Sequence, residues 1–309
     1  MNHRLVSIII PCFNAEQFVG DAIRSALAQT YRPCEVIVID DGSTDRSLEV
    51  IRSFGNEIKF ESGPNRGGSA ARNRALELAA GEFVQFLDAD DLLHPDKLSR
   101  QVPHLISSPR SVICCNWELQ DEDTEARRCR VLHGTQLDSL RFVVRNQLTI
   151  CGPLHRKAEL VAIGGFRECL PCCQEFDLHV RLAISGISWK HLNEALVTIR
   201  RRHRSVSSDL IRVLDQHEDI CWNAYRSMER AGNLTQDRAA ALAEQLARDA
   251  RWYLERGHYD KSKHYFQQAL LMHREGGLNA TYRPHTRLLR RVLGPTITER
   301  LVAFKRGLI

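Results

Sequence analysis

Residues 5–43 read LVSIIIPCFNAEQFVGDAIRSALAQTYRPCEVIVIDDGS. The apolar run LVSIII is ended by Pro11 and is typical of a strand buried on both faces. The next segment places apolar side chains at helical spacing, and Asn14 is its predicted N-cap. The run EVIVI then predicts a second strand, which leads directly into Asp40, Asp41 and a glycine turn. This stretch therefore predicts a strand, a helix and a strand that ends in two carboxylates.

The same alternation continues along the chain. It predicts helices over 44–55, 69–80 and 96–108 and strands over 58–63, 82–87 and 111–119. Pro103 is expected to kink or split the third of these helices. The alternation indicates an α/β fold with an open, mostly parallel sheet and helices on both faces. In such sheets ligands bind beyond the carboxyl ends of the strands.

Acidic residues follow two of the predicted strands at their carboxyl ends. Asp41 follows the second strand, and Asp88, Asp90 and Asp91 follow the strand over 82–87, so these carboxylates are expected to converge on one cleft. Carboxylate oxygens are ligands that Mg²⁺ or Mn²⁺ prefers, and such a cation stabilises the charge on a leaving diphosphate. The alternative is an acidic loop that caps the following helix through Asp91 or Asp96.

The composition restricts the class of protein. None of the apolar runs in the 309 residues approaches the roughly 18 that a membrane-spanning helix needs, and the first is too short for a signal peptide. We therefore expect a cytoplasmic protein whose ten cysteines are reduced. The segment Cys169-Leu-Pro-Cys172-Cys173 lacks the second pair that a structural zinc site needs, so loop thiols are expected. No G-x-G-x-x-G follows the first strand, which argues against a dinucleotide-dependent oxidoreductase.

The last third of the chain has a different texture. Residues 210–275 contain no strand-like run, and 246–273 predict two helices joined by a glycine-containing turn, similar to one tetratricopeptide unit. One such unit cannot bury its own apolar face, so a scaffold of repeats is not expected. We therefore divide the chain into an α/β domain at 1–208 and a helical C-terminal extension at 209–309.

The segment 280–309 is basic. It holds seven Lys or Arg residues against Glu299 alone, and its apolar residues form two short amphipathic pieces. One interpretation is peripheral contact with an anionic membrane at the inner face of the plasma membrane. The other is packing of its leucines on the α/β domain. Without interleaved aromatic residues, a nucleic-acid partner is not expected.

Four ordered segments carry a resemblance to a known family. They are residues 6–47, GPNRGGSAARNRALELAAGEFVQFLDADD at 63–91, IGGF at 163–166 and QEFDLHVRLA at 174–183. Over roughly the first 205 residues the chain resembles the family 2 glycosyltransferases of the GT-A fold. The resemblance implies an inverting transferase that uses a divalent cation, Mn²⁺ or Mg²⁺, and a nucleoside-diphosphate sugar, above all a UDP-sugar. It also implies a glycan or lipid-linked acceptor and a role in cell-surface polysaccharide or glycoconjugate synthesis.

On the donor side the resemblance implies a nucleotide pocket formed by Pro11, Phe13, Asn14, Asp41, Arg72 and Asp88. It implies that Asp41 binds the nucleotide base, that Asp88 contacts the ribose and that Asp90 is a metal ligand. His203 matches a position from which an imidazole approaches the metal or the diphosphate. The alternative for Arg72 is a surface helix arginine, and the alternative for His203 is an exposed residue of a basic loop.

On the acceptor side the chain departs from the family pattern. The family shows a Glu-Asp pair whose Asp is the catalytic base, and this chain has Gln174 and Glu175 there. The resemblance therefore places Glu175 at the base position, with Asp177 as the rival base or as an N-terminal helix cap. Because of this departure, the alternative function is a catalytically impaired nucleotide-sugar-binding protein with a helical interaction surface.

Overall fold

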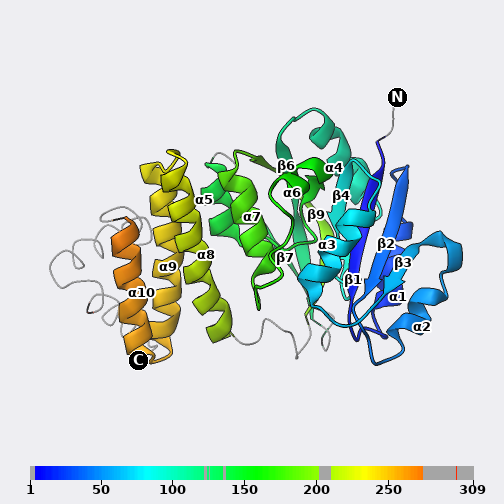
Figure 1. The fold of residues 1–309 in the computed structure, drawn as a ribbon, viewed down its shortest axis with the longest axis horizontal. Coiled ribbons are helices and arrows are strands. Elements are labelled where there is room, and N and C mark those ends of the chain that lie inside the picture. Colours follow the sequence, from blue (N-terminus) through cyan, green and yellow to red (C-terminus); the bar gives the residue numbers. More distant parts are fainter. Residues whose placement is uncertain are drawn as a thin grey trace. The chain divides into compact units, whose positions relative to one another are not determined.

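The computed structural model describes residues 4–121, 124, 126–134, 137–201, 210–273 and 297. The chain forms two compact units, each described here by itself (Figure 1). The first comprises residues 1–139 and 146–208, and the second comprises 140–145 and 209–309. Residues 140–145, which we expected in the first domain, thus group with the helical C-terminal residues.

The described residues of the first unit form a nine-stranded sheet with the order β3-β2-β1-β4-β8-β6-β9-β5, and β7 pairs with β6. The strands are β1 (Val6–Cys12), β2 (Cys34–Asp40), β3 (Lys59–Ser62), β4 (Phe83–Phe86), β5 (Leu92–Leu93), β6 (Ser111–Asp121), β7 (Arg127–Arg130), β8 (Leu154–Arg156) and β9 (Ser188–Arg201). Figure 1 shows β1, β2 and β3 side by side in blue.

The strand directions bring several carboxyl ends to the same end of the sheet. β3, β2, β1 and β4 pair in parallel. β8 is antiparallel to both β4 and β6, so β6 runs in the direction of β4, and β9 runs parallel to β6. Only β5, β7 and β8 of the described strands run the other way. The predicted α/β fold with a mostly parallel sheet is confirmed, and β1 is buried along nearly its whole length as expected.

Helices surround this sheet. They are α1 (Val19–Leu27), α2 (Ser47–Arg52), the 3₁₀ turn η1 (Gly55–Glu57), α3 (Gly68–Leu78), α4 (Lys97–Ile106), α6 (Lys157–Ala162) and α7 (Gln174–Ile184). Their apolar residues face the sheet at helical spacing, as in α1, where Val19, Ile23 and Ala26 are buried. The packing of α3 on β1 and β2 places the start of α3 at the carboxyl end of the sheet.

Three local predictions were wrong. Pro11 does not end the first strand, because β1 continues to Cys12. Asn14 does not cap α1, which begins at Val19. Pro103 does not split its helix, because α4 runs continuously past it to Ile106. Pro11 therefore lies inside the strand that it was expected to end, and Pro103 lies inside one continuous helix.

The second unit contains the helices α5 (Ser139–Asn146, of which 140–145 belong here), α8 (Leu210–Arg230), α9 (Gln236–Glu255) and α10 (Tyr259–Met272). The expected pair of helices over 246–273 is confirmed, with Gly257 at φ +80° in the turn. Arg141 of α5 forms an ion pair of 2.5 Å with Glu244 of α9. In the described part of the chain, no helix is both long and apolar enough to cross a bilayer.

A cluster of polar aromatic rings lies in the core of the first unit. His155 and His179 are fully buried and stack with ring centroids 5.9 Å apart, and Trp189 packs edge-on against both. Among the described residues, none offers a hydrogen-bond partner to the ring nitrogens of these three side chains. Burial lowers the pKa of His179 to about 3 and that of His155 well below its usual value, so both rings are neutral at pH 7.

We expect this cluster to make the protein sensitive to mild acid. Below the unfolded-state pKa of about 6.5 the unfolded chain binds protons that buried His179 does not, so stability is present above that pH and falls as the pH drops toward 3. From pH 7 to pH 5 the loss is about 2 kcal/mol for His179. Urea unfolding should show that His179→Phe loses less stability between pH 7 and pH 5 than the chain without a substitution. The control His104→Gln, at an exposed histidine, should lose as much as that chain. Equal pH dependence in all three proteins would contradict the explanation.

Candidate active site

Two buried aspartates follow each other at the carboxyl end of β2. Asp40 accepts a hydrogen bond of 2.7 Å from the hydroxyl of Ser62. Asp41 accepts the backbone N–H groups of Arg66 and Gly67, each at 2.8 Å and one on each carboxylate oxygen. Because these amides stand directly before α3, Asp41 holds the start of that helix at the carboxyl end of the sheet.

The loop after β1 is joined to the loop after β2. Asn14 adopts the left-handed conformation with φ 48°, which asparagine tolerates better than most residues. Its backbone N–H donates to Oγ of Ser43 at 3.0 Å, and its Oδ1 accepts the N–H of Thr44 at 2.8 Å. Phe13 is 49% exposed beside it, and Pro11 is half-buried at the end of β1. Asn14 therefore ties the loop after β1 to the loop after β2.

Arg72 pairs with the acid that follows β4. Its Nη2 donates to Oδ1 of Asp88 at 2.5 Å, and its guanidinium lies 5.5 Å from the ring centroid of Phe166. Burial opposes the charge of Arg72, but the carboxylates of Asp88 and Glu175 outweigh it and raise the pKa of Arg72. Only 14% of the Arg72 side chain is exposed, so it is not a surface arginine.

The last acid of the cluster is a buried anchor. Asp91 accepts the backbone N–H of Arg200 at 3.0 Å through Oδ1 and the thiol of Cys151 at 3.3 Å through Oδ2. The same sulfur accepts the N–H of Asp88 at 3.3 Å. Burial raises the pKa of Asp91 well above its usual value, and the charges of Asp88 and Asp90 add to this shift. The loop after β4 is therefore fixed to both β9 and the turn before β8.

A buried lysine stabilises the turn before β8. Lys97 of α4 is fully buried, and its Nζ donates to Oε1 of Gln85 at 2.6 Å and to the carbonyl of Gly152 at 3.1 Å. Because Gly152 follows Cys151 directly, this contact helps to place the thiol between the two aspartates. Burial lowers the pKa of Lys97.

The donor set fits a hard divalent cation. Among the described residues, the one group of three or more side chains whose ligand atoms lie within 4.8 Å of one another is Asp88, Asp91 and Cys151. Burial raises the pKa of the Cys151 thiol well above its usual value, so the sulfur stays protonated and is a poor partner for Mg²⁺ or Mn²⁺. Asp91 has both oxygens engaged, whereas Asp88 and Asp90 are half-buried. Asp90 is not a member of this group, so its role as a metal ligand stays a prediction, and Asp88 is the half-buried carboxylate that the group offers.

Helix α7 is locked in place by Asp177. This side chain is 2% exposed, and its oxygens pair with Arg167 at 3.0 Å and Arg181 at 2.7 Å. The expected N-cap role of Asp177 is wrong, because α7 begins at Gln174 with Cys173 as its N-cap. Glu175 stands in the first turn of the helix, where the helix dipole favours an ionised carboxylate. The structure thus separates a buried acid held by two arginines, Asp177, from the half-buried Glu175, whose charge raises the pKa of Arg72.

A comparison with protein families gives the same assignment as the fold and the motifs. Residues 7–156 match the model described as Glycosyl transferase family 2. The matched segment contains β1 to β4, the acidic loop and Cys151. Residues 7–156 belong to glycosyltransferase family 2.

Named relatives of this chain are bacterial. It is 32% identical over 232 residues to an uncharacterized glycosyltransferase of Rickettsia conorii, over 72% of this chain and 38% of the relative. It is 28% identical over 240 residues to the putative teichuronic acid biosynthesis glycosyltransferase TuaG of Bacillus subtilis, over 73% and 89%. The chain therefore spans well under half the length of the Rickettsia relative.

The fold comparison extends to nearly the whole chain. The crystal structure of S. aureus TarS 1–349 in complex with UDP-GlcNAc matches with a TM-score of 0.73 and 19% identity, over 98% of this chain and 92% of that chain. At this level of identity the likeness shows the fold, which is the GT-A fold that the resemblance implied.

Two predicted features of this chain fall outside the described residues. His203 and the neighbouring Arg202 and Arg204 are among them, and so is the basic segment 280–309 apart from Ile297. Arg200, which precedes them and is described, directs its Nη2 to Oδ2 of Asp21 at 2.9 Å. The backbone N–H of Arg200 also binds the acidic cluster through Asp91.

Asn73 has a role that the sequence did not indicate. Its side chain accepts the N–H of Phe166 at 2.8 Å and donates to the carbonyl of the same residue at 2.9 Å. A Cβ on Gly165 would lie 2.6 Å from Oδ1 of Asn73, so glycine is required for this approach. Asn73 thereby holds the Gly164-Gly165-Phe166 turn against α3, beside Arg72.

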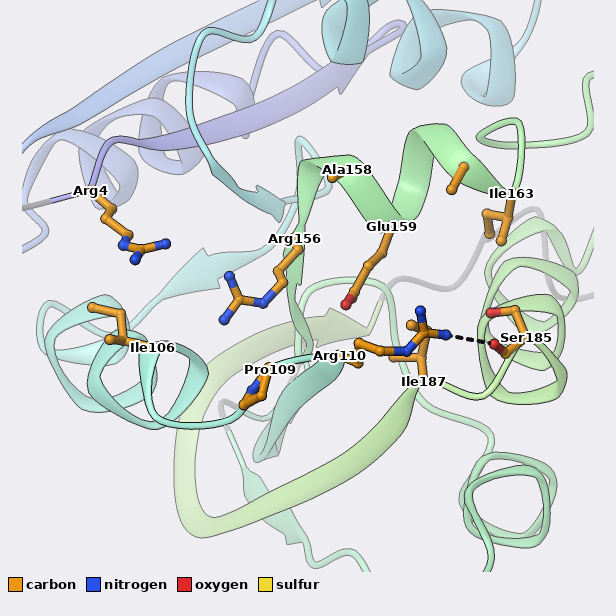
Figure 2. Close-up of a pocket in the computed structure, with 11 residues that line it drawn as sticks. Arg4, Ile106, Pro109, Arg110, Arg156, Ala158, Glu159, Ile163, Ser185 and Ile187 are labelled. Atoms are coloured by element: carbon orange, nitrogen blue, oxygen red, sulfur yellow. Dashed lines mark hydrogen bonds between the residues drawn. The ribbon is translucent and has the colours of Figure 1, made fainter.

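A pocket elsewhere in the first unit is not this site. It has a volume of about 650 Å³, and Arg4, Arg110, Arg156 and Glu159 line it (Figure 2). Arg156 pairs with Phe83, the first residue of β4, so the pocket lies at the amino ends of the strands. None of the candidate residues lines it.

Proposed function

We propose that this chain is an inverting glycosyltransferase of cell-surface polysaccharide assembly. It would move a sugar from a nucleoside-diphosphate sugar, with a UDP-sugar as the first candidate, to a hydroxyl of a glycan or lipid-linked acceptor. The observation that carries the proposal is Arg72, which is 14% exposed, binds Asp88, and has its pKa raised by the charges of both Asp88 and Glu175. The UDP-GlcNAc complex of TarS supports the donor class, and the name of TuaG supports the process.

The donor side would use the residues at the carboxyl ends of β1, β2 and β4. Asp41 would accept a hydrogen bond from the base while it holds the Arg66–Gly67 backbone, and Asp88 would contact the ribose. Asp90, with Asp88 and His203, would hold a divalent cation. When bound, that cation supplies positive charge that stabilises the departing diphosphate. The loop of Pro11, Phe13 and Asn14 would form the rim of the nucleotide pocket.

The acceptor side would use Glu175 as the base. The carboxylate takes the proton of the acceptor hydroxyl, the hydroxyl oxygen attacks the anomeric carbon, and the nucleoside diphosphate leaves from the opposite face. This single displacement inverts the anomeric centre. The charge of Arg72 and the start of α7 both favour the ionised form of Glu175, which is the form that a base needs.

Asp177 is the weaker candidate for this role. Its carboxylate is 2% exposed and bound to two guanidinium groups. Removing it would leave Arg181 inside the protein without its partner, so Asp177→Asn tests folding more than chemistry. The proposal therefore rests on Glu175.

Ligand binding tests the donor class before any acceptor is known. UDP in the presence of Mn²⁺ is expected to raise the free energy of unfolding by about 2.7 kcal/mol at a UDP concentration one hundred times its Kd. Differential scanning fluorimetry with nucleoside diphosphates and their sugars, with Mn²⁺ and with EDTA, measures this shift. EDTA is expected to weaken the stabilisation, because the cation contacts the diphosphate. NADH serves as the control, and stabilisation by NADH with none by any nucleoside diphosphate would overturn the proposal.

A further inference from the structure

Two consecutive cysteines stand at the start of the helix that carries Glu175. The sulfur atoms of Cys172 and Cys173 are 3.9 Å apart, and the residues are 6% and 9% exposed. Cys173 is the N-cap of α7 and adopts the left-handed conformation with φ 58°, which few residues other than glycine adopt. Its carbonyl accepts the N–H of Asp177 at 3.0 Å and so begins the helix.

These thiols do not form a metal site with the nearby Cys169. Within the described ranges, the cysteine segment brings no three ligand atoms together, and the acidic cluster is the group that does. Structural zinc needs four ligands. The close approach of two thiols therefore requires another chemical interpretation.

We propose that Cys172 and Cys173 form a redox modification site, and that their oxidation to a disulfide by a low-molecular-weight disulfide displaces Glu175 and reversibly stops sugar transfer. The modification itself depends only on the two thiols. The effect on transfer rests on the proposed function.

The reaction is two successive thiol–disulfide exchanges. The thiolate of one cysteine attacks a sulfur of the small disulfide, forms a mixed disulfide and releases one small thiol. The second cysteine then attacks the protein-bound sulfur, closes the Cys172–Cys173 bond and releases the second small thiol. The two cysteines are oxidised, the small disulfide is reduced, and the cysteine protons end on the two released thiols. An excess of small thiol reverses both steps.

The bond requires the backbone to move. Consecutive Cα atoms across a trans peptide lie about 3.8 Å apart, whereas disulfides usually join Cα atoms about 4.4–6.8 Å apart. Closing the ring therefore distorts the peptide unit between Cys172 and Cys173, which is the N-cap of α7. Glu175 is two residues further along, so it is in the first turn that must adjust.

The movement is confined to this short segment. Arg167 before it and Asp177 after it are joined by an ion pair of 3.0 Å. Arg181 further along α7 donates to the carbonyls of Ile163 at 3.0 Å and Gly165 at 2.8 Å. Because both ends are held, the strain of the ring falls on residues 168–176.

Mass spectrometry tests the modification on the full chain. Reduced protein is incubated with glutathione disulfide, the remaining thiols are alkylated, and the peptides are mapped. We expect Cys172 and Cys173 to escape alkylation with the loss of two hydrogen atoms, and dithiothreitol to restore both. Cys172→Ser and Cys173→Ser should each leave a mixed disulfide on the other cysteine. Full alkylation of both residues after oxidation would overturn the proposal.

Cys169→Ser is the matched control, because Cys169 is exposed three residues earlier. This variant is expected to form the Cys172–Cys173 disulfide as readily as the chain without a substitution. If the disulfide disappears in Cys169→Ser, Cys169 is one of its partners and the assignment to the vicinal pair is wrong.

Hydrogen exchange separates the displacement from the catalytic proposal. Oxidation should raise amide exchange at 174–178 by about tenfold or more, leave the Kd for UDP within about twofold, and lower sugar transfer at least tenfold until reduction. Unchanged exchange in the oxidised protein would overturn the displacement of Glu175. If exchange increases on oxidation but neither the oxidised nor the reduced chain transfers sugar, the redox site at Cys172 and Cys173 is supported and the proposed function is wrong.

Discussion

Glu175→Gln is expected to lower the rate of sugar transfer by roughly 10²–10⁴-fold, the usual contribution of a positioned general base. The amide keeps the size of the side chain but cannot take the proton of the acceptor hydroxyl. Because Glu175 lies on α7 and the donor residues lie at the ends of β1, β2 and β4, the Kd for UDP should stay within about twofold. Steady-state kinetics should therefore show a lower kcat with little change in the KM for the donor.

Two further variants make this result specific. Glu159→Gln changes a half-buried acid whose pKa is raised by burial, but at the other end of the sheet, and should leave transfer unchanged. Glu175→Asp places the residue of the family pattern at the base position and should retain part of the activity. Full activity in Glu175→Gln would show that another group is the base. If the chain without a substitution binds the donor but transfers no sugar, it is a catalytically impaired nucleotide-sugar-binding protein, which is the alternative function.

Asp90→Ala is expected to lower transfer by about a thousandfold or more, because a bound cation contributes several kcal/mol to stabilising the leaving diphosphate. The variant keeps Asp91, whose contacts with Arg200 and Cys151 hold the loop, so folding should be preserved. UDP binding by the variant should lose most of its dependence on Mn²⁺. Isothermal titration with and without Mn²⁺ measures this directly.

The control for Asp90→Ala lies a few residues along the same segment. Asp96 is exposed, and its Oδ1 accepts the hydroxyl of Thr30 at 2.9 Å, so Asp96→Asn should leave Mn²⁺-dependent binding unchanged. If Asp90→Ala retains full Mn²⁺ dependence, the cation is held by Asp88 and Asp91 instead, and the assignment of Asp90 is wrong.

The sequence predicted most strands and helices because each depends on a local pattern. The apolar run of β1 and the helical spacing of α1 and α3 are readable within about ten residues. The errors came where distant contacts outweigh a local preference. Asparagine is a residue type that commonly caps helices, but Asn14 forms its hydrogen bonds with the loop after β2, about thirty residues away.

The candidate site was predictable where residue type and strand end coincide, as at Asp41, Asp88 and Asp90. The supporting contacts were not, because they join segments far apart in the chain. Cys151 was expected only as one of ten reduced thiols, yet its thiol joins the backbone of Asp88 to the side chain of Asp91. Asp177 has the spacing of a helix cap, and only the folded chain brings Arg167 to it.

If the acidic loop holds the proposed cation, the anchoring of Asp91 would let it select ions by radius. Both oxygens of Asp91 are engaged, and Cys151 also holds the backbone of Asp88, so the loop has little freedom to widen. Mg²⁺ requires oxygen ligands at about 2.0–2.1 Å, whereas Ca²⁺ requires six to eight of them at about 2.3–2.6 Å. A loop held in this way would favour the smaller ion, and it would do so through one buried acidic side chain that need not touch the ion.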